Sequence, residues 1–429
     1  MGFPLSRYRA AVDALFARTA GGVKPGLERT EALLDVLGNP QRRLRTFHVA
    51  GTNGKGSVCA TLDHLLRAKG LRVGRYTSPH LVDFRERIVI DGRPIGEAEV
   101  ADWLTRYDPQ IEQLGATFFE ATTALAFDHF DREAVDVAVI ETGLGGRLDS
   151  TNVVQPVAAV VTSIGLDHTD LLGSTIEQIA GEKAGIFKRG SAALIGEREP
   201  RIAELLREAA GERGAGPTLS VGRDWRVSAV EVGERGTRFA LGDGADAQRF
   251  ETPLVGEHQA YNAALAIVTL LAAGDEWSPT AAEAAAALRR VRLPGRFQRV
   301  GRTIFDVAHN PAGAAVVAET VARSGIEHPV TTVLAVLADK DWRAMMDTLA
   351  SFTDRFVLTV APTAPPGRIW SLDEASDHAR RSRYVAAVEP DFARALKNAA
   401  ISEGTTLVTG SFHTVGDAMA RLQVDPLDG

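Results

Sequence analysis

Cysteine is almost absent from this chain of 429 residues: only Cys59 occurs, so no disulfide can form within it and a reducing compartment is expected. Positive charge is also in short supply, because the formal net charge is −7. This balance argues against a general binder of nucleic acid or of membrane surfaces. We therefore expect neither among the partners, and an anionic ligand would need a local positive site.

Long apolar runs are missing as well. No stretch approaches the ~20 apolar residues of a membrane-spanning helix. Charges are spread through Met1–Ala20, so we expect no signal peptide. No internal repeat is found, and 45% hydrophobic with 24% charged residues is the composition of a soluble globular enzyme. A cytoplasmic protein is predicted.

Short β-branched runs alternating with helical patterns predict an α/β fold. The runs lack polar alternation, which is typical of a parallel sheet covered on both faces; they occupy Arg45–Ala50, Val135–Glu141 and Pro156–Gly165. Helices are predicted over Ala121–Phe130, Thr175–Phe187 and His258–Ala273, and an alanine-rich helix is predicted to end near Arg290.

A second alternation follows the break at Pro294-Gly295. Its predicted strands are TIFDVA, PVTTVLAVLAD, RFVLTVA and TTLVTG, and APTAPPGR (Ala361–Arg368) is predicted to be a loop. A chain of this length is expected to form two domains. We place the boundary near Arg296, which gives an N-terminal domain of residues 1–295 and a smaller C-terminal domain of residues 296–429.

The segment TFHVAGTNGKGSVCATLDHLL (Thr46–Leu66) predicts a phosphate-binding loop between a strand and a helix. Glycines at 51, 54 and 56 let backbone N–H groups approach an anion, and the helix beginning near Lys55 adds the positive end of its dipole. Lys55 can reach the β- and γ-phosphates, and Ser57 is placed to hold Mg²⁺.

The loop departs from the usual pattern G-x-x-x-x-G-K-[ST]. Val49 stands where the first glycine belongs, and Gly56 separates Lys55 from Ser57. A plain turn is the alternative interpretation, which the preceding strand and the following apolar helix disfavour.

Carboxylate and imidazole groups follow two predicted strands. Glu141 stands at the carboxyl end of one strand, where α/β sheets bind ligands, and Asp167, His168 and Asp170 follow the next. Taken singly, Glu141 could cap a helix or form a salt bridge, and His168 could be structural. Two such strand ends together favour a metal site.

Six ordered segments resemble the folylpolyglutamate and dihydrofolate synthases of the Mur ligase family of ATP-dependent amide-bond formers. They are GTNGKGS, ETGLGGRLDSTN, LDHTDLLGSTIEQIAGEKAGIFK, EHQAYNAALA, PGRF and FDVAHNPAG, and the resemblance runs from about Gly26 to Gly416. It implies a P-loop ATPase-like N-terminal domain, a Rossmann-like C-terminal domain and a monomer. One departure is Ala338, in VLADKD, where we expect glycine.

The resemblance also implies the ATP and metal sites. The phosphates would be held by Gly51, Thr52, Asn53, Gly54, Lys55, Gly56 and Ser57, and the nucleotide would be contacted by Asn262, Arg296 and Asp306. Of two Mg²⁺ ions, the first would lie near Ser57 and Ser78, and the second would be bound by Glu141 and His168. Lys183, otherwise an ordinary solvated helix lysine, would be a carbamate that supplies a further oxygen ligand. The implied catalytic residues are Lys55, Lys183 and His309.

The implied substrate residues fall into three groups. Those near the pterin are Arg29, Pro79, His80, Phe118, Phe119 and Glu120; those near the rest of the pteroate are Arg147, Leu148 and Asp149; those near the incoming glutamate are His309, Ser411 and His413. One or both phenylalanines could instead be core residues. Ser411 and His413 could equally be ordinary loop residues.

The resemblance implies that ATP drives addition of L-glutamate to 7,8-dihydropteroate and to the γ-carboxylate of tetrahydrofolate or its polyglutamates, through an acyl phosphate. A monofunctional folylpolyglutamate synthase is an alternative. A peptidoglycan ligase is disfavoured because only about 50 residues precede Gly51. A regulatory nucleotide-binding relative without turnover is disfavoured because Ser57, Glu141, His168 and Lys183 are retained.

Overall fold

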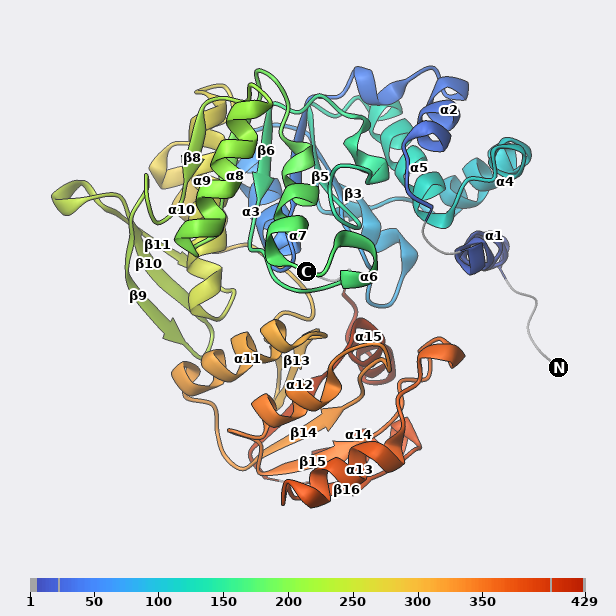
Figure 1. The fold of residues 1–429 in the computed structure, drawn as a ribbon, viewed down its shortest axis with the longest axis vertical. Helices are drawn as coiled ribbons and strands as arrows, with labels where there is room; N and C mark the ends of the chain where they lie inside the picture. Colours follow the sequence, from blue (N-terminus) through green and yellow to red (C-terminus); the bar gives the residue numbers. More distant parts are fainter. Residues whose placement is uncertain (1–5, 22–23, 402, 427–429) are drawn as a thin grey trace.

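The computed structural model describes residues 6–21, 24–401 and 403–426; residues 1–5 and 427–429, at the outer ends of the two predicted domains, lie outside it. The described part contains three sheets flanked by helices (Figure 1). Two sheets lie before residue 295, and the third, drawn in orange and red, lies after it. No helix within the described ranges is long and apolar enough to cross a membrane.

The first sheet has the strand order β4-β3-β2-β5-β1-β6-β7-β8. Its strands from β2 to β8 in this order are parallel, and β3 and β4 add an antiparallel edge. Their bounds are β1 Thr46–Ala50, β2 Val73–Tyr76, β3 Ile88–Ile90, β4 Arg93–Pro94, β5 Val137–Glu141, β6 Ala158–Val161, β7 Ala192–Ile195 and β8 Thr218–Ser220. The predicted mostly parallel sheet is confirmed.

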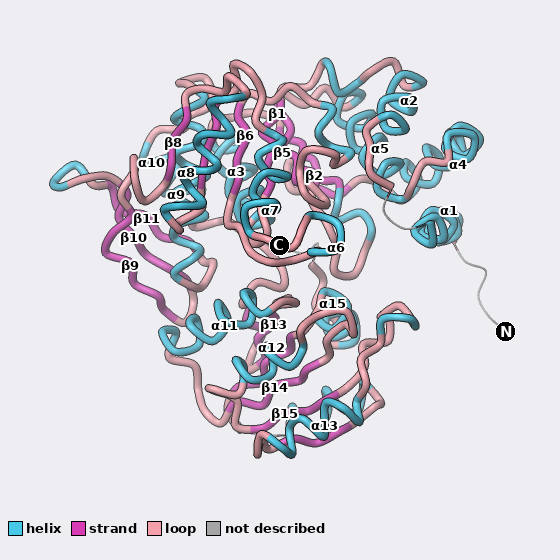
Figure 2. Tube along the Cα trace, in the orientation of Figure 1, coloured by secondary structure: helices cyan, strands magenta, loops and turns pink. Residues whose placement is uncertain are grey.

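Helices cover both faces of this sheet, which explains why its central strands are apolar on both sides (Figure 2). One face packs against α3 (Lys55–Ala68), α9 (Glu257–Ala273) and α10 (Ala281–Leu288). The other face packs against α1 (Arg7–Ala17), α2 (Glu28–Val36), α4 (Glu97–Leu114), α5 (Phe118–Arg132), α7 (Ile176–Lys183) and α8 (Pro200–Glu212).

A second sheet of three antiparallel strands was not predicted. It consists of β9 (Val227–Gly233), β10 (Gly236–Leu241) and β11 (Gln248–Thr252). All residues of β9 and three of the five in β11 are exposed or only partly buried, so these two strands lack the continuous apolar runs that marked the other strands.

The third sheet has the order β12-β13-β17-β14-β15-β16, parallel except for the edge strand β12. Its strands are β12 Gln298–Val300, β13 Thr303–Asp306, β14 Val330–Leu334, β15 Arg355–Leu358, β16 Ala386–Val388 and β17 Thr405–Thr409. One face packs against α11 (Pro311–Ser324), α12 (Trp342–Leu349) and α13 (Leu372–Arg381), the other against α14 (Phe392–Ala400) and α15 (Phe412–Arg421). The four predicted strands are present, and the division at residue 295 stays a prediction.

Short helices complete the chain. They are α6 (Thr169–Leu172) and the 3-10 turns η1 Arg18–Gly21, η2 Pro40–Arg42, η3 Phe84–Arg87, η4 Ser150–Val153, η5 Ala184–Ile186, η6 Gly244–Asp246 and η7 Pro366–Arg368. The helix predicted over Thr175–Phe187 is shorter, since α7 ends at Lys183 and η5 follows. Gly185 packs against Arg147 so closely that an added Cβ would lie 2.5 Å from its Cα.

A buried histidine in β1 should make stability fall in acid. His48 lies 2.8 Å from the Thr151 hydroxyl through Nε2, and its Nδ1 has no partner. Burial, then the charge of Lys188, lowers the pKa of His48 from 6.5 to about 3. Below pH 6.5, His48 therefore binds a proton in the unfolded chain but stays neutral in the folded protein. The free energy of unfolding should fall by about 1.4 kcal/mol per pH unit from this residue until pH approaches 3.

Thermal denaturation at about pH 7.5 and about pH 5.5 checks this. His48→Gln cannot titrate in this range, so its midpoint should drop less between the two pH values than that of the unchanged protein. An equal drop in both proteins would show that other groups cause the acid sensitivity.

Candidate active site

The predicted phosphate loop connects β1 to α3. Gly51 and Gly54 have φ angles of +151° and +90°, in the region that favours glycine. A Cβ at Gly54 would lie 2.8 Å from the side-chain oxygen of Asn262. The first turn of α3, which starts at Lys55, has no side-chain cap, so its backbone N–H groups remain available to an anion.

The loop is fixed to the adjacent strand β6. The Thr162 hydroxyl donates to the carbonyl of Asn53 over 2.7 Å, and the backbone N–H of Thr52 donates to the carbonyl of Ser163 over 2.7 Å. These bonds hold the loop in shape before any ligand arrives, which is the preorganisation that a phosphate site requires.

Replacing Gly51 should destabilise the protein. A Cβ at this position would lie 1.7 Å from the Thr162 hydroxyl oxygen, on top of an unfavourable φ angle. Gly51→Ala should lower the free energy of unfolding by about 1–3 kcal/mol. Gly56 is the matched control, because it lies in α3 with its nearest neighbour, Leu293, at 3.8 Å. Thermal denaturation should show a loss for Gly51→Ala only; equal midpoints for both variants would contradict the prediction.

Two lysines converge on one carbonyl oxygen of the loop. Lys55 and Lys183 each donate from Nζ to the Gly51 carbonyl over 3.0 Å. Lys183 is 4% exposed, and burial, then the nearby charge of Lys55, lowers its pKa from 10.5 to about 7. Lys183 is therefore no solvated surface residue, and its burial beside Lys55 favours the neutral amine.

The predicted metal ligands meet beside this loop. Glu141 is buried at the end of β5, and its Oε2 accepts from the backbone N–H of Ser78 over 3.2 Å. Burial raises the pKa of Glu141, although Lys55 acts in the opposite direction. His168 follows β6 with a φ of +52°, and burial lowers its pKa.

Most predicted site residues line two adjoining cavities. A cavity of about 120 Å³ is lined by Gly51, Thr52, Asn53, Gly54, Lys55, Gly56, Ser78, Pro79, Glu141, His168, Lys183, Arg296 and His309. A cavity of about 320 Å³ is lined by Asn53, Gly54, Ser57, Asn262, Arg296, Asp306 and His309. The structure therefore brings together side chains from both predicted domains.

The C-terminal domain closes one side of these cavities. Asp306, at the end of β13, accepts from the backbone N–H groups of Phe297 and Ala308 over 2.8 and 2.9 Å. The Arg296 guanidinium lies 5.3 Å from the centre of the Phe412 ring. Burial lowers the pKa of Arg296 and raises that of Asp306, and each charge partly offsets the other's shift.

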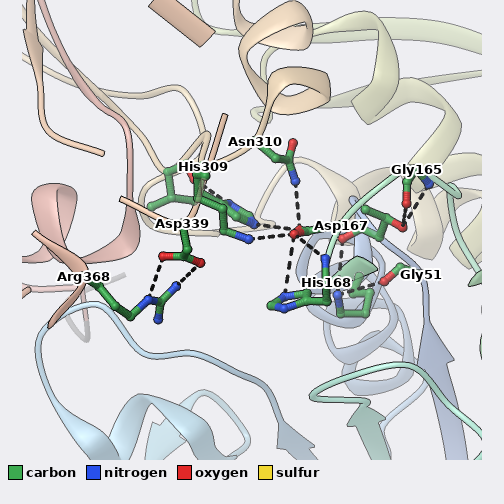
Figure 3. A network of polar contacts seen from close by, with 12 residues as sticks. Gly51, Gly165, Asp167, His168, His309, Asn310, Asp339 and Arg368 are labelled. Atoms are coloured by element: carbon green, nitrogen blue, oxygen red, sulfur yellow. Dashed lines mark hydrogen bonds and ion pairs between the residues drawn. The ribbon is translucent and has the colours of Figure 1, made fainter. Parts of the chain in front are cut away.

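A network of polar contacts joins the two domains at Asp167 (Figure 3). Asp167 follows β6, and its carboxylate lies 2.6 Å from Lys340 Nζ, 3.2 Å from Asn310 Nδ2 and 3.7 Å from His309 Nε2. Although burial opposes ionisation, hydrogen bonds from His309 and Lys340 hold the pKa of Asp167 far below its usual range.

The predicted pterin residues lie on the α5 side. Arg29 and Glu120 pair with each other at 2.9 Å, and Glu120 also accepts from the backbone N–H of Thr117 at the start of α5. Both charges are thereby used within the protein. The Phe118 ring stacks on Phe16 with centroids 4.5 Å apart and is buried, as a core residue would be.

His80 and Phe119 lie on either side of this aromatic cluster. His80 accepts from Arg87 Nε at Nδ1 over 2.8 Å, and burial, then the Arg87 charge, lowers the pKa of His80 to about 3. The Phe119 ring fills the space against Gly143, where an added Cβ would lie 2.4 Å from a ring carbon.

Of the predicted substrate residues, only Pro79 and His309 line the two cavities, so the five just described lie outside them, as do five more. Arg147 pairs with Glu182 at 2.7 Å, Leu148 is exposed and Asp149 accepts from the backbone N–H groups of Leu144 and Thr151. Ser411 caps α15 by accepting from the backbone N–H of Thr414, and His413 Nδ1 lies 2.9 Å from the Thr363 hydroxyl. Their ligand roles stay predictions.

Several residues at the site were missed by the sequence analysis. Phe412 lines the smaller cavity, and Asn310 and Lys340 bind Asp167. Phe412 stands between the two residues that were selected, Ser411 and His413. Lys340 belongs to VLADKD, where only Ala338 had attracted notice, so the segment was visible but its spatial neighbour was not.

The predicted metal ligands do not form a cage by themselves. Within the described residues, no three His, Cys, Asp or Glu side chains are close enough to hold a metal ion. This arrangement fits Mg²⁺, which usually takes one or two carboxylates and completes its shell with phosphate oxygens and water. Glu141 and the Ser57 hydroxyl at the start of α3 are groups of the right kind.

Comparison with known proteins identifies the two halves of the chain. Residues 49–270 match the model of the Mur ligase middle domain, and residues 295–412 match that of the Mur ligase glutamate ligase domain. The dihydrofolate synthase/folylpolyglutamate synthase of Bacillus subtilis is 35% identical over 97% of this chain and 99% of the relative. The Escherichia coli protein of the same name is 36% identical over 97% and 95%.

Solved structures agree. The Mycobacterium tuberculosis folylpolyglutamate synthase complexed with ADP superimposes with a TM-score of 0.88 at 32% identity, covering 98% of this chain and all of the other. Escherichia coli FolC in complex with DHPP and ADP gives 0.85 at 34% identity, covering 99% of each chain. The resemblance predicted from the six segments is confirmed. The chain belongs to the Mur ligase family, among its ATP-dependent glutamate ligases of the dihydrofolate synthase/folylpolyglutamate synthase type.

Proposed function

We propose that this protein uses ATP to join L-glutamate both to 7,8-dihydropteroate and to the γ-carboxylate of tetrahydrofolate and its polyglutamates. The observation that carries the proposal is the meeting of the phosphate loop, the two lysines and Glu141 around one cavity at the domain junction. Relatives that cover the whole chain carry both activities in their names, and one solved relative binds DHPP and ADP.

ATP would bind across the two adjoining cavities. The nucleoside would occupy the cavity of about 320 Å³ between Asn262 and Asp306. The phosphates would then lie on the loop and the N-terminus of α3, where backbone N–H groups and Lys55 offset their charge. Arg296 lines both cavities and adds a cation at the point where the two domains meet.

Two Mg²⁺ ions would be held by residues of this chain. Ser57 and Ser78 would serve the first, and Glu141, His168 and Lys183 the second. When bound, the ions would supply positive charge that polarises the phosphoryl group. This charge would also offset the repulsion among the triphosphate, the substrate carboxylate and glutamate. The interaction between these charges is stronger where protein groups replace water, because the effective dielectric constant is lower there.

Lys183 would contribute as a carbamate. CO₂ reacts with a neutral amine, and the lowered pKa of about 7 makes that form abundant near neutral pH. The side chain is 4% exposed and donates a hydrogen bond to a backbone carbonyl, so a carbamate oxygen would not have to displace a carboxylate partner. The reaction forms a bond between Nζ and the carbon of CO₂, releases one proton to solvent and leaves an anion next to the predicted metal ligands.

The reaction would proceed in two transfers. The substrate carboxylate attacks the γ-phosphorus of ATP, giving an acyl phosphate and ADP. The α-amine of glutamate then attacks the acyl carbon, and phosphate leaves as the amide forms. Alignment of the reactants can supply on the order of 7–11 kcal/mol of the barrier reduction, and the C-terminal domain excludes water from the acyl phosphate. His309, Ser411 and His413 would place the glutamate.

Residues suited to two kinds of substrate lie on opposite faces of the first sheet, in keeping with both activities. On the α5 face lie Phe118 and its aromatic neighbours, which suit a flat pterin. On the α3 face, a cavity of about 410 Å³ extends from Glu141 to the guanidinium groups of Arg67 and Arg75. Guanidinium groups suit the carboxylates of glutamyl residues.

The protein would act as a cytoplasmic monomer without nucleic-acid or membrane partners. The single cysteine and the net charge of −7 support this placement.

Phosphate release by the purified protein tests the proposal. With ATP, Mg²⁺ and L-glutamate, release should require a third substrate and should occur with either 7,8-dihydropteroate or tetrahydrofolate. Release with tetrahydrofolate alone would favour a monofunctional folylpolyglutamate synthase and overturn the pteroate assignments. Release with neither would favour a nucleotide-binding relative without turnover.

A further inference from the structure

The contact between Asp167 and the C-terminal domain reaches a predicted metal ligand. The Asp167 oxygen that bonds Lys340, Oδ1, also accepts from the backbone N–H of His168 over 3.0 Å. The same oxygen lies 3.8 Å from His168 Nε2. One carboxylate oxygen therefore connects a lysine of the C-terminal domain to both the backbone and the ring of His168 (Figure 3).

The conformation of His168 needs such support. Its φ of +52° is a left-handed backbone conformation, which is uncommon for a residue other than glycine. The following helix, α6, has only four residues and none of them is buried, so it offers little packing to hold the histidine in place. The His168 carbonyl accepts from the backbone N–H groups of Leu171 and Leu172, and the Asp167 carboxylate is the side chain that holds the His168 backbone N–H.

The partners of Asp167 come from two loops of the C-terminal domain. Lys340 follows β14, and Asn310 caps α11 by accepting from the backbone N–H of Gly313 through Oδ1. Its Nδ2 is thereby turned toward Asp167. Lys340 and Asp167 are each 12% exposed, so their ion pair is shielded from solvent far more than a surface pair.

We propose that Asp167 is a positioning residue that couples docking of the C-terminal domain to the placement of the His168 ring. Lys340 and Asn310 hold Asp167 when the domains are together, and Asp167 then fixes the turn that carries His168. When the domains separate, Asp167 loses Lys340, Asn310 and the nearby His309, and the turn at His168 is no longer held. The proposal rests on the proposed function in one respect, namely that His168 is a metal ligand.

This coupling would keep the reaction centre incomplete until the domain that brings glutamate has docked. An acyl phosphate is readily hydrolysed, so completing the metal site only in the closed state limits loss of ATP without product. The link is mechanical and local: one ion pair and one backbone hydrogen bond share a single oxygen atom.

Lys340→Met tests the proposal, because methionine keeps much of the side-chain length and removes the charge. Arg343→Met is the matched control. Arg343 lies three residues after Lys340, in the first turn of α12, and forms a surface ion pair with Glu374 of the same domain. Lys340→Arg keeps the positive charge, so its Mn²⁺ affinity and its scattering should be close to those of the unchanged protein. The full-length protein is used throughout.

Two measurements other than activity are made with a non-hydrolysable ATP analogue. Titration with Mn²⁺, followed by electron paramagnetic resonance, should show affinity at the weaker site reduced about 10–100-fold in Lys340→Met, the range seen when the partner of a metal ligand is removed. Small-angle scattering should show a more extended molecule for Lys340→Met than for the unchanged protein. Arg343→Met should match the unchanged protein in both, and the Mg²⁺ needed for half-maximal phosphate release should rise only in Lys340→Met.

Unchanged Mn²⁺ affinity in Lys340→Met would overturn the coupling, even if the molecule became more extended. Unchanged scattering would overturn the role of Lys340 in docking. If the unchanged protein releases no phosphate with either substrate, the proposed function fails. Scattering and Mn²⁺ binding would still show whether Lys340 holds the domains together and whether docking affects the metal site.

Discussion

Lys55→Ala should lower kcat on the order of 10³-fold while leaving the protein folded. Lys55 stands at the first position of α3 and donates to the Gly51 carbonyl over 3.0 Å, so its ammonium group lies beside the phosphate loop. In the proposed reaction it offsets negative charge on the β- and γ-phosphates. That charge moves during transfer, so the loss should appear mainly in kcat rather than in the KM for the pteroate substrate.

The same substitution should leave stability nearly unchanged. Lys55 donates hydrogen bonds to the backbone carbonyls of Gly51 and Thr52, and its charge lowers the pKa of buried Lys183 by repulsion. Removing one of two neighbouring cations relieves that repulsion. Lys69, exposed at the other end of α3, provides the control: Lys69→Ala should retain full turnover. Near-normal ADP formation by Lys55→Ala would refute the assignment of the loop.

Three strands of the first sheet (β1, β5 and β6) and four of the third (β13, β14, β15 and β17) were predictable from runs rich in β-branched residues, whereas β2, β3, β4, β7 and β8 were not predicted. The strands β1, β5, β6 and β14 are buried along their whole length, which a sheet covered on both faces explains, although β1 and β14 also carry buried threonines and β1 carries His48. The three-stranded sheet escaped notice because its strands are half exposed. The edge strands β12 and β16 are three residues each and only partly buried, too short to leave a pattern.

The site was predictable only as far as sequence neighbours reveal chemistry. Glycines of the loop mark a backbone that must approach an anion, and Glu141 marks a strand end. The burial of Lys183 had no signal in the residues around it, because helix α7 buries it against a loop more than a hundred positions away. Only the resemblance to the ligase family singled out Lys183 as a candidate site residue. Asp167 and Lys340 meet across 173 positions, and no local pattern could pair them.

Local hydrogen bonding also limits what a match to a family pattern can establish. The Ser411 hydroxyl caps α15 by accepting from the backbone N–H of Thr414. Glu120 forms an ion pair with Arg29 and accepts from the backbone N–H of Thr117 at the start of α5. Both satisfy a structural need within this chain. A ligand role for either must be compatible with those bonds, so substitution at these positions would affect folding and binding together.

Glu141→Gln should lower turnover on the order of 10²-fold or more without loss of stability. The amide keeps the shape of the side chain and can still accept from the backbone N–H of Ser78, but it carries no charge for a cation. Losing a metal ligand at a transferring phosphoryl group removes several kcal/mol of transition-state stabilisation, and each 1.36 kcal/mol is about tenfold in rate. The Mg²⁺ concentration needed for half-maximal phosphate release should rise at the same time.

Stability should respond differently because the charge of Glu141 is unfavourable in the folded protein. Burial raises the pKa of this carboxyl, so above its ordinary pKa the ionised group costs stability that a neutral amide does not. The thermal midpoint of Glu141→Gln near pH 7.5 should therefore equal or exceed that of the unchanged protein. Glu389→Gln is the control, since Glu389 also follows a parallel strand, β16, but lies outside the cavities. Lower stability combined with normal Mg²⁺ dependence would show that Glu141 serves the fold; higher stability with lost turnover is the trade expected of a residue kept for catalysis.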